Sequence, residues 1–176
     1  MGNSTNEIYT VGHSTRPIEE FIELLKSYGI EEVIDVRTIA GSKYNPQYNE
    51  ENLRKSLEEN GLAYLHLKEL GGLRHPTKDS INKGWINKSF RGYADYMQTS
   101  EFSKAIEQLI VLSNKNKVVI MCAEAVPWKC HRSLIGDALT VRKIKVTDIL
   151  GIGNHMTHKL TKFAQAKGHD VSYPKQ

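Results

Sequence analysis

The sequence predicts an α/β protein, organised as a three-layer sandwich in which helices flank both faces of a mostly parallel central sheet. Short β-branched runs alternate along the chain with segments whose apolar residues recur at helical spacing. The run Val118–Met121 contains only apolar residues, which is typical of a parallel strand covered on both faces. The chain has 176 residues and no Gly/Ser, Pro or Gln tract that would mark a linker, so we expect one α/β domain over residues 1–176.

Three strands separated by two helices are predicted in the first half of the chain. The strands are Ile8–Val11, Glu32–Val36 and Ala63–Leu67. The first helix is predicted with Pro17 at its first helical position, Ser14 or Thr15 as its cap and Gly29 at its left-handed end. The second helix spans Asn49–Asn60 and is terminated by Gly61.

The periodicity breaks in the middle of the chain and then resumes. Residues 69–90 show no repeat and contain several turn-forming pairs, so an irregular loop or lid is expected there. Tyr93–Ser113 is predicted as one broken helix or two helices. A buried strand at Val118–Met121, a helix at Ser133–Val141 and a last strand at Val146–Leu150 complete the expected order.

Composition and charge narrow the classes of function. Two cysteines are too few for a disulfide scaffold, and Met1–Asn6 lacks a secretory layout, which predicts a cytoplasmic protein. The longest apolar run, Val118–Ala123, is far shorter than the ~20 residues that cross a bilayer, so no membrane span is expected. Residues 115–176 carry 11 Lys and Arg against 4 Asp and Glu, a charge of +7 that favours an anionic small molecule or a nucleic acid as partner. A solvated lysine-rich surface is the alternative reading of this charge.

Polar, potentially reactive residues follow almost every predicted strand. They are His13 and Ser14 after the first strand, Asp35 and Arg37 at the second, His66 in the third and Cys122 after the fourth. A single His in a strand or Asp at a strand end usually has a structural role. Ligands of parallel sheets bind outside the carboxyl ends of the strands, so these side chains are expected to converge on one crevice.

The densest group of such residues lies between Cys122 and Arg132, where the buried strand gives way to a helix. Backbone amides at a helix start attract anions, and Lys129 and Arg132 would add charge-assisted contacts. The same positive field would lower the pKa of Cys122 or Cys130. Two inert buried cysteines beside a surface arginine are the alternative. A metal held by both thiols and His131, with His13 or His66, is not expected, because seven residues separate the thiols.

These motifs resemble those of the uncharacterised DUF488 family. The resemblance is carried by Thr10-Val11-Gly12-His13-Ser14, Asp35-Val36-Arg37, Leu70-Gly71-Gly72, Cys122-Ala123-Glu124, Pro127 and Cys130-His131-Arg132. It implies a site but no particular reaction. A weaker similarity links Val33–Arg37 and Val118–Ser133 to rhodanese-like domains, although nine residues separate Cys122 from Arg132 where those enzymes use a compact loop.

The preferred hypothesis is an enzyme, a thiol-dependent hydrolase or transferase, that acts on a phosphorylated or other anionic substrate in a Cys/His/Arg cleft. The predicted catalytic residues are Cys122, Cys130, His131, Glu124, Asp35 and His13, and the predicted substrate-binding residues are Ser14, Arg37, Gly71, Gly72, Lys129 and Arg132. A nucleic-acid-binding module with Trp85, Tyr93 and Tyr96 as stacking residues is one alternative. The others are a rhodanese-like sulfur or phosphate transfer enzyme and a non-catalytic metal or ligand sensor. The cofactor is left unassigned.

Overall fold

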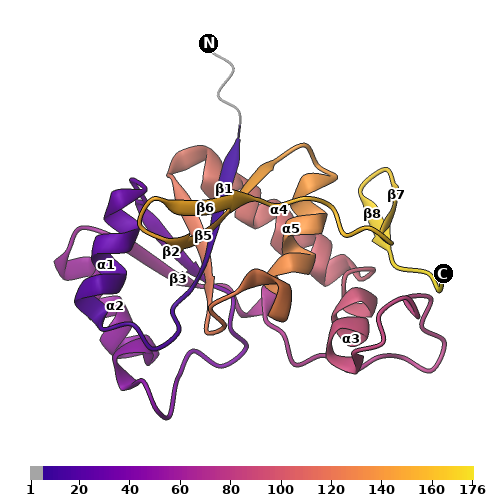
Figure 1. Ribbon diagram of the computed structural model, residues 1–176, viewed down its shortest axis with the longest axis horizontal. Helices are drawn as coiled ribbons and strands as arrows, with labels where there is room; N and C mark the ends of the chain where they lie inside the picture. The colour runs from indigo at the N-terminus through magenta and orange to yellow at the C-terminus, as the bar shows by residue number, and fades with distance from the viewer. Residues whose placement is uncertain (1–5) are drawn as a thin grey trace.

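The computed structural model describes residues 6–176 and has a six-stranded central sheet with the strand order β3-β2-β4-β1-β5-β6 (Figure 1). The strands are β1 (Glu7–Gly12), β2 (Glu32–Asp35), β3 (Ala63–His66), β4 (Val118–Cys122), β5 (Lys145–Gly151) and β6 (Asn154–Thr157). Strands β1 to β5 pair in parallel, and β6 pairs antiparallel with β5 at one edge. The predicted α/β class with a mostly parallel sheet is confirmed.

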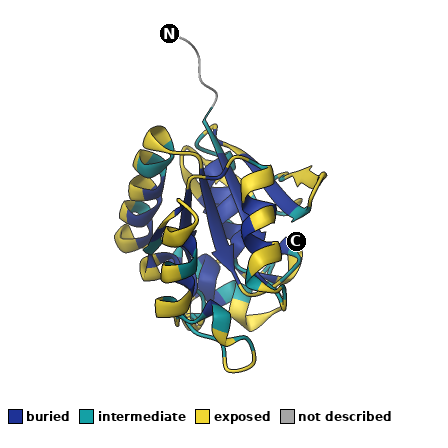
Figure 2. Cartoon of the chain, turned by 90° about the vertical axis from the view of Figure 1, so that its left-hand side faces the viewer, coloured by how far each residue is buried: buried dark blue, intermediate teal, exposed yellow. Residues whose placement is uncertain are grey.

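Helices cover both faces of the sheet. They are α1 (Ile18–Ser27), α2 (Glu50–Glu59), α3 (Lys88–Tyr96), α4 (Ser100–Lys115) and α5 (Arg132–Thr140). Alternate residues of the strands pack against α1 and α2 on one face and against α3, α4 and α5 on the other, which produces two hydrophobic clusters. Figure 2 shows the buried sheet between helices whose outer faces are exposed. This arrangement is the predicted three-layer sandwich.

The helix ends follow the local sequence closely, with one exception. Gly29 and Gly61 adopt φ values of 72° and 79°, the left-handed conformation expected of residues that follow a helix. Pro17 is the cap residue of α1 and not its first helical residue, so neither Ser14 nor Thr15 caps the helix, and no side-chain cap hydrogen bond forms. The segment predicted as one or two helices is two, and the Thr99 side chain accepts a hydrogen bond from the Phe102 amide at the start of α4.

Residues 71–87 contain no helix or strand, and their middle is held by hydrogen bonds. The single-turn helix η2 (Lys68–Leu70) precedes them and α3 follows. The buried side chain of Asn82 donates to Asp95 and accepts from the backbone amide of Tyr173. The first residues of the segment, which include Gly72 and Leu73, lie beside the carboxyl ends of the strands, where they line a pocket.

Elements after β5 were not predicted from the sequence. They are β6 and a small antiparallel hairpin of β7 (Gln165–Lys167) and β8 (Asp170–Ser172). The buried carboxylate of Asp137 on α5 holds this region, since it accepts from His158, from the Thr161 amide and from the Tyr173 hydroxyl. No helix within residues 6–176 is long and apolar enough to cross a membrane. The expectation about a secretory layout concerned Met1–Asn6, of which Met1–Thr5 lie outside the described residues.

Candidate functional site

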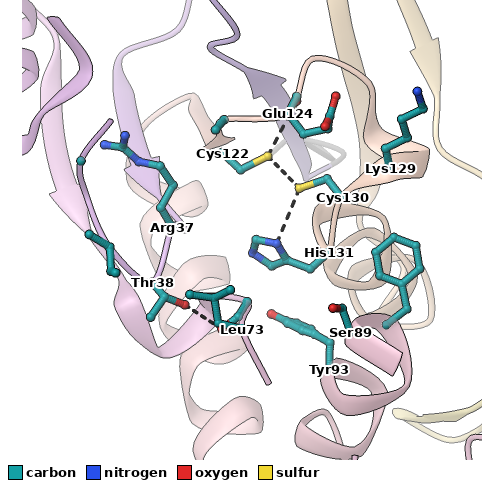
Figure 3. Close-up of a pocket in the computed structure, with 15 residues that line it drawn as sticks. Arg37, Thr38, Leu73, Ser89, Tyr93, Cys122, Glu124, Lys129, Cys130 and His131 are labelled. Carbon is teal, nitrogen blue, oxygen red and sulfur yellow. Dashed lines mark hydrogen bonds between the residues drawn. The ribbon is translucent and has the colours of Figure 1, made fainter. Parts of the chain in front are cut away.

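A pocket of about 390 Å³ opens where the carboxyl ends of β2 and β4 meet the start of α5 (Figure 3). Its base is formed by Cys122, Cys130 and His131. The remaining lining residues are Arg37, Thr38, Ile39, Gly41, Gly72, Leu73, Ser89, Phe90, Tyr93, Ala123, Glu124 and Lys129. The volume lies within the range of about 300–1,000 Å³ that is typical of small-molecule sites.

Two free thiols face each other at the base of the pocket. Cys122 ends β4, whereas Cys130 follows the single-turn helix η3 (Pro127–Lys129) that precedes α5. Their Sγ atoms are 2.7 Å apart, and both residues are more than nine-tenths buried. The segment through η3 therefore brings Cys130 next to Cys122 at the end of β4.

Arg132 lies behind the thiols and does not line the pocket. Its side chain is 1% exposed, and Nη1 donates to Cys122 Sγ at 3.0 Å and to the Glu124 carbonyl oxygen at 2.7 Å. Nη2 donates to the Ala125 carbonyl oxygen at 3.3 Å, while Nε is buried without a partner in the described part of the chain. Within residues 6–176, Arg132 forms no ion pair with a carboxylate. The sulfur of Cys122 is thus the group within hydrogen-bonding distance that can neutralise the guanidinium.

The two thiols differ in acidity. Burial raises the pKa of Cys122, but the hydrogen bond from Cys130 and the charge of Arg132 outweigh it and lower that pKa to about 7. The hydrogen bond to Cys122 raises the pKa of Cys130 well above its ordinary value, and burial raises it further. Cys122 is consequently the more acidic thiol of the pair.

His131 is held as a neutral imidazole next to Cys130. Its Nε2 lies 3.0 Å from the Val36 carbonyl oxygen, which can only accept, so Nε2 carries the proton. Nδ1 then presents its lone pair 3.6 Å from Cys130 Sγ. Burial lowers the pKa of His131 to about 4, so the ring is uncharged at neutral pH.

A second polar cluster supports the wall of the pocket beside β2. Arg37 donates through Nε and Nη2 to the two carboxylate oxygens of Asp35, at 2.9 and 2.6 Å. His13 stacks on Tyr48 and lies 3.5 Å from Arg37 Nη1. Burial lowers the pKa of His13 to about 4. The Arg37 charge is therefore already paired with a carboxylate.

The structure brings only part of the predicted site into the pocket. Among the predicted residues, those that line it are Cys122, Cys130, His131, Glu124, Arg37, Gly72 and Lys129. Asp35, His13 and Arg132 contact lining residues from behind, as described above. The Ser14 amide donates to the Ala123 carbonyl oxygen, and Gly71 packs against Thr38. His66 lies elsewhere, with Nε2 hydrogen-bonded to the Arg37 carbonyl oxygen.

The backbone amides at the start of α5 donate hydrogen bonds to acceptors within the protein. The Arg132 amide donates to Cys130 Sγ at 3.5 Å, and the Ser133 amide donates to the Cys130 carbonyl oxygen. The next two amides of the helix donate to the His131 carbonyl oxygen. The expectation that these amides face an anion in the crevice is thus corrected, because the positive end of α5 is directed at a thiol.

Sequence reasoning missed the apolar walls of the pocket. Ile39 and Leu73 are strongly exposed apolar residues in polar loops, which is the one local signal that pointed to them. Phe90 comes from α3, where an aromatic residue at helical spacing is indistinguishable from a core residue, and Tyr93 of the same helix was predicted only as a stacking residue.

The aromatic residues that would stack on bases in the nucleic-acid hypothesis are not open to a ligand, and the side chains that would bind a metal are not grouped into a site. Tyr93 and Tyr96 are buried, and Trp85 packs against Phe90, Phe163 and Tyr173, so these rings are not free to stack on bases. Within residues 6–176, no three or more His, Cys, Asp and Glu side chains are grouped so as to hold a metal ion.

Comparison with known proteins places the chain in a family. No curated protein and no solved structure matches it, and the similarity to rhodanese-like domains is accordingly not shown. The family described as "Domain of unknown function DUF488" matches residues 17–139, which include the Asp35-Val36-Arg37 and Leu70-Gly71-Gly72 motifs and the segment from Cys122 to Arg132. The chain therefore belongs to the DUF488 family.

Proposed function

We propose that this protein is a thiol-dependent transferase in which Cys122, as a thiolate, attacks a small anionic substrate bound in the pocket. The observation that carries the proposal is the contact of 3.0 Å between Arg132 Nη1 and Cys122 Sγ. A guanidinium cannot lose its proton in a protein, and a buried charge is costly unless it is paired. The thiolate form of Cys122 supplies that partner.

Transfer is favoured over hydrolysis by what surrounds the sulfur. A second thiol lies 2.7 Å from Cys122, and the one imidazole at the base of the pocket directs its lone pair at Cys130. That imidazole is therefore positioned to take a proton from a thiol rather than from water. A group captured by Cys122 would meet a sulfur nucleophile first.

The anionic character of the substrate is proposed from Lys129. This lysine is exposed, lines the pocket and forms no ion pair within residues 6–176. The other cationic lining residue, Arg37, is neutralised by Asp35. The apolar lining residues Ile39, Leu73 and Phe90 would contact the apolar part of the substrate.

Alkylation of Cys122 with neutral iodoacetamide and anionic iodoacetate, followed by peptide mass spectrometry, tests both parts of the proposal. We expect the rate at Cys122 to rise with a midpoint near pH 7, whereas Cys130, the internal control, reacts slowly throughout. Iodoacetate should be favoured over iodoacetamide by about 2- to 5-fold relative to free cysteine, the effect of one exposed charge pair.

Lys129→Ala should abolish the preference for iodoacetate. Lys55→Ala is the matched control, because Lys55 is an exposed lysine on α2, on the opposite face of the sheet. A Cys122 rate that follows free cysteine across the pH range would refute the thiolate. An unchanged iodoacetate preference in Lys129→Ala would refute the anion site.

A further inference from the structure

The second thiol of the pocket, Cys130, is hydrogen-bonded to Cys122 but takes no covalent part in the first attack. We infer that Cys130 is a resolving thiol and that the substrates are small-molecule disulfides, which the Cys122–Cys130 pair reduces by becoming a disulfide itself. The inference rests on the proposed role of Cys122 and adds the class of substrate and the second step.

The spacing of the two sulfurs favours this step. A disulfide bond is about 2.0 Å long, and Cys122 Sγ and Cys130 Sγ are 2.7 Å apart with no atom between them in Figure 3. Both thiols are free and both line the same pocket. A mixed disulfide formed on Cys122 is thus within reach of Cys130 without any change in the course of the chain.

The surroundings of Cys130 also suit a thiol that must lose its proton at the second step. His131 Nδ1 lies 3.6 Å from Cys130 Sγ, and its lone pair is directed there because Nε2 donates to Val36. The Arg132 amide at the start of α5 donates to Cys130 Sγ. A helix start stabilises negative charge, so the thiolate that forms on Cys130 is favoured at the moment of attack.

The reaction balances as two successive exchanges. The Cys122 thiolate attacks one sulfur of the substrate RS–SR, the mixed disulfide Cys122–S–S–R forms, and RS⁻ leaves. Cys130 then attacks Cys122 Sγ, the Cys122–Cys130 disulfide forms, and the second RS⁻ leaves and takes up the proton that Cys130 loses. The substrate is reduced to two thiols while the protein dithiol is oxidised, and an external dithiol restores the protein by the same exchange in reverse.

The walls of the pocket define the disulfides it would accept. Phe90, Leu73 and Ile39 give the pocket an aromatic and aliphatic lining, and Lys129 is an exposed lining residue. A disulfide of aryl or alkyl groups that carry a carboxylate satisfies both features. Dithiobis(nitrobenzoate) is such a molecule, and each thiolate that it releases is coloured.

The test uses the full chain in its reduced form with one equivalent of dithiobis(nitrobenzoate). We expect a fast release of the first thiolate, a second release that follows it, and a product mass lower than that of the starting protein by two hydrogens with no adduct. Cys130→Ser and Cys130→Ala should release only the first thiolate and retain the aryl adduct on Cys122. Cys122→Ser should lose the fast first release.

Each outcome separates the two proposals. If the wild type shows no fast release of the first thiolate, the role of Cys122 is overturned. If the first release is fast but the aryl adduct on Cys122 is stable, only the role of Cys130 is overturned. The wild type unfolded in urea is the control, because it shows how fast the second release is when the two cysteines are close in sequence but not held together by the fold. The second release should be about tenfold or more faster in the folded protein, since the fold holds the thiols in contact. Equal rates would overturn the inference.

Discussion

The ionisation of Cys122 should make the stability of the protein depend on pH in a defined window, and Cys122→Ser removes that dependence. The contacts with Cys130 and Arg132 lower the pKa of Cys122 from 9.0 to about 7, against the opposing effect of burial. An ionisable group whose pKa is depressed by folding contributes stability above its unfolded pKa and loses it as the pH falls through the folded pKa. The window therefore runs from pH 9 down to pH 7.

The size of the effect follows from the shift. Each pH unit of difference between the folded and unfolded pKa values corresponds to about 1.4 kcal/mol, so a shift of about two units corresponds to about 3 kcal/mol in the free energy of unfolding. The wild type should gain about 2 kcal/mol of this amount, relative to Cys122→Ser, as the pH rises from 7 to 9, and the rest lies just outside these midpoints. Cys122→Ser should also be less stable at every pH above 7, because Arg132 is left as a buried charge without an anionic partner.

Urea unfolding of both proteins at half-unit pH intervals measures the difference directly. Cys130→Ser is the matched control, because its hydroxyl can still donate to the Cys122 thiolate and the pH dependence between 7 and 9 should persist. A difference between wild type and Cys122→Ser that stays constant over this range would show that Cys122 does not ionise in the folded protein. The electrostatic argument for a thiolate would then be refuted.

Three further substitutions test the surroundings of the site by chemical unfolding. Gly12→Ala should lower the free energy of unfolding by about 3 kcal/mol or more, because a Cβ would lie 1.7 Å from the Glu124 carbonyl oxygen. In the control Gly151→Ala the nearest neighbour of the Cβ is 3.7 Å away, so the loss should be less than about 1 kcal/mol. Equal losses would contradict the close approach at Gly12. Burial lowers the pKa of His13 to about 4, so the wild type should lose up to about 3 kcal/mol of stability through this residue as the pH falls from 6.5 to 4. His13→Asn should not show this part of the loss. Parallel stability profiles of the two proteins in acid would argue against it. Asp35→Ala should cost about 3–5 kcal/mol by leaving Arg37 buried and unpaired, and adding Arg37→Met should recover part of this loss; no recovery would mean that the ion pair is not the cause.

The central sheet was predictable because its signals are local. The β-branched and apolar runs at residues 8–11, 32–36 and 118–121 form strands that are buried on both faces, so neither face needs polar residues. Gly29 and Gly61 mark helix ends because the left-handed conformation is costly for other residues. Each of these features is determined by a few neighbouring residues.

The region after β5 was not predictable because its structure depends on distant partners. All four residues of β6 are exposed, and this strand exists through its pairing with β5. The contacts of Asp137 with His158 and Tyr173 join residues 21 and 36 positions apart, and the alternation of residues gives no sign of them. Long-range hydrogen bonds leave no period in a sequence.

The candidate site was only partly predictable for the same reason. The concentration of reactive residue types between Cys122 and Arg132 is visible in the sequence, but the directions of their side chains depend on the path of the loop. Arg132 was expected to hold an anion in the crevice. It is buried instead, because the loop turns the Glu124 and Ala125 carbonyl oxygens toward it and Cys122 Sγ completes its contacts.

The acidity of Cys122, the proposed nucleophile, depends in part on a glycine on a neighbouring strand. Gly12 ends β1 and pairs with Cys122 in the sheet, and the Glu124 carbonyl group occupies the space that a side chain at Gly12 would fill. That carbonyl oxygen accepts from Arg132 Nη1, the same nitrogen that donates to Cys122 Sγ. Absence of a side chain at Gly12 thus allows the carbonyl to fix the guanidinium, and the guanidinium stabilises the thiolate. Gly12, which has no side chain, thereby helps to determine which of the two thiols, Cys122 or Cys130, is the more acidic.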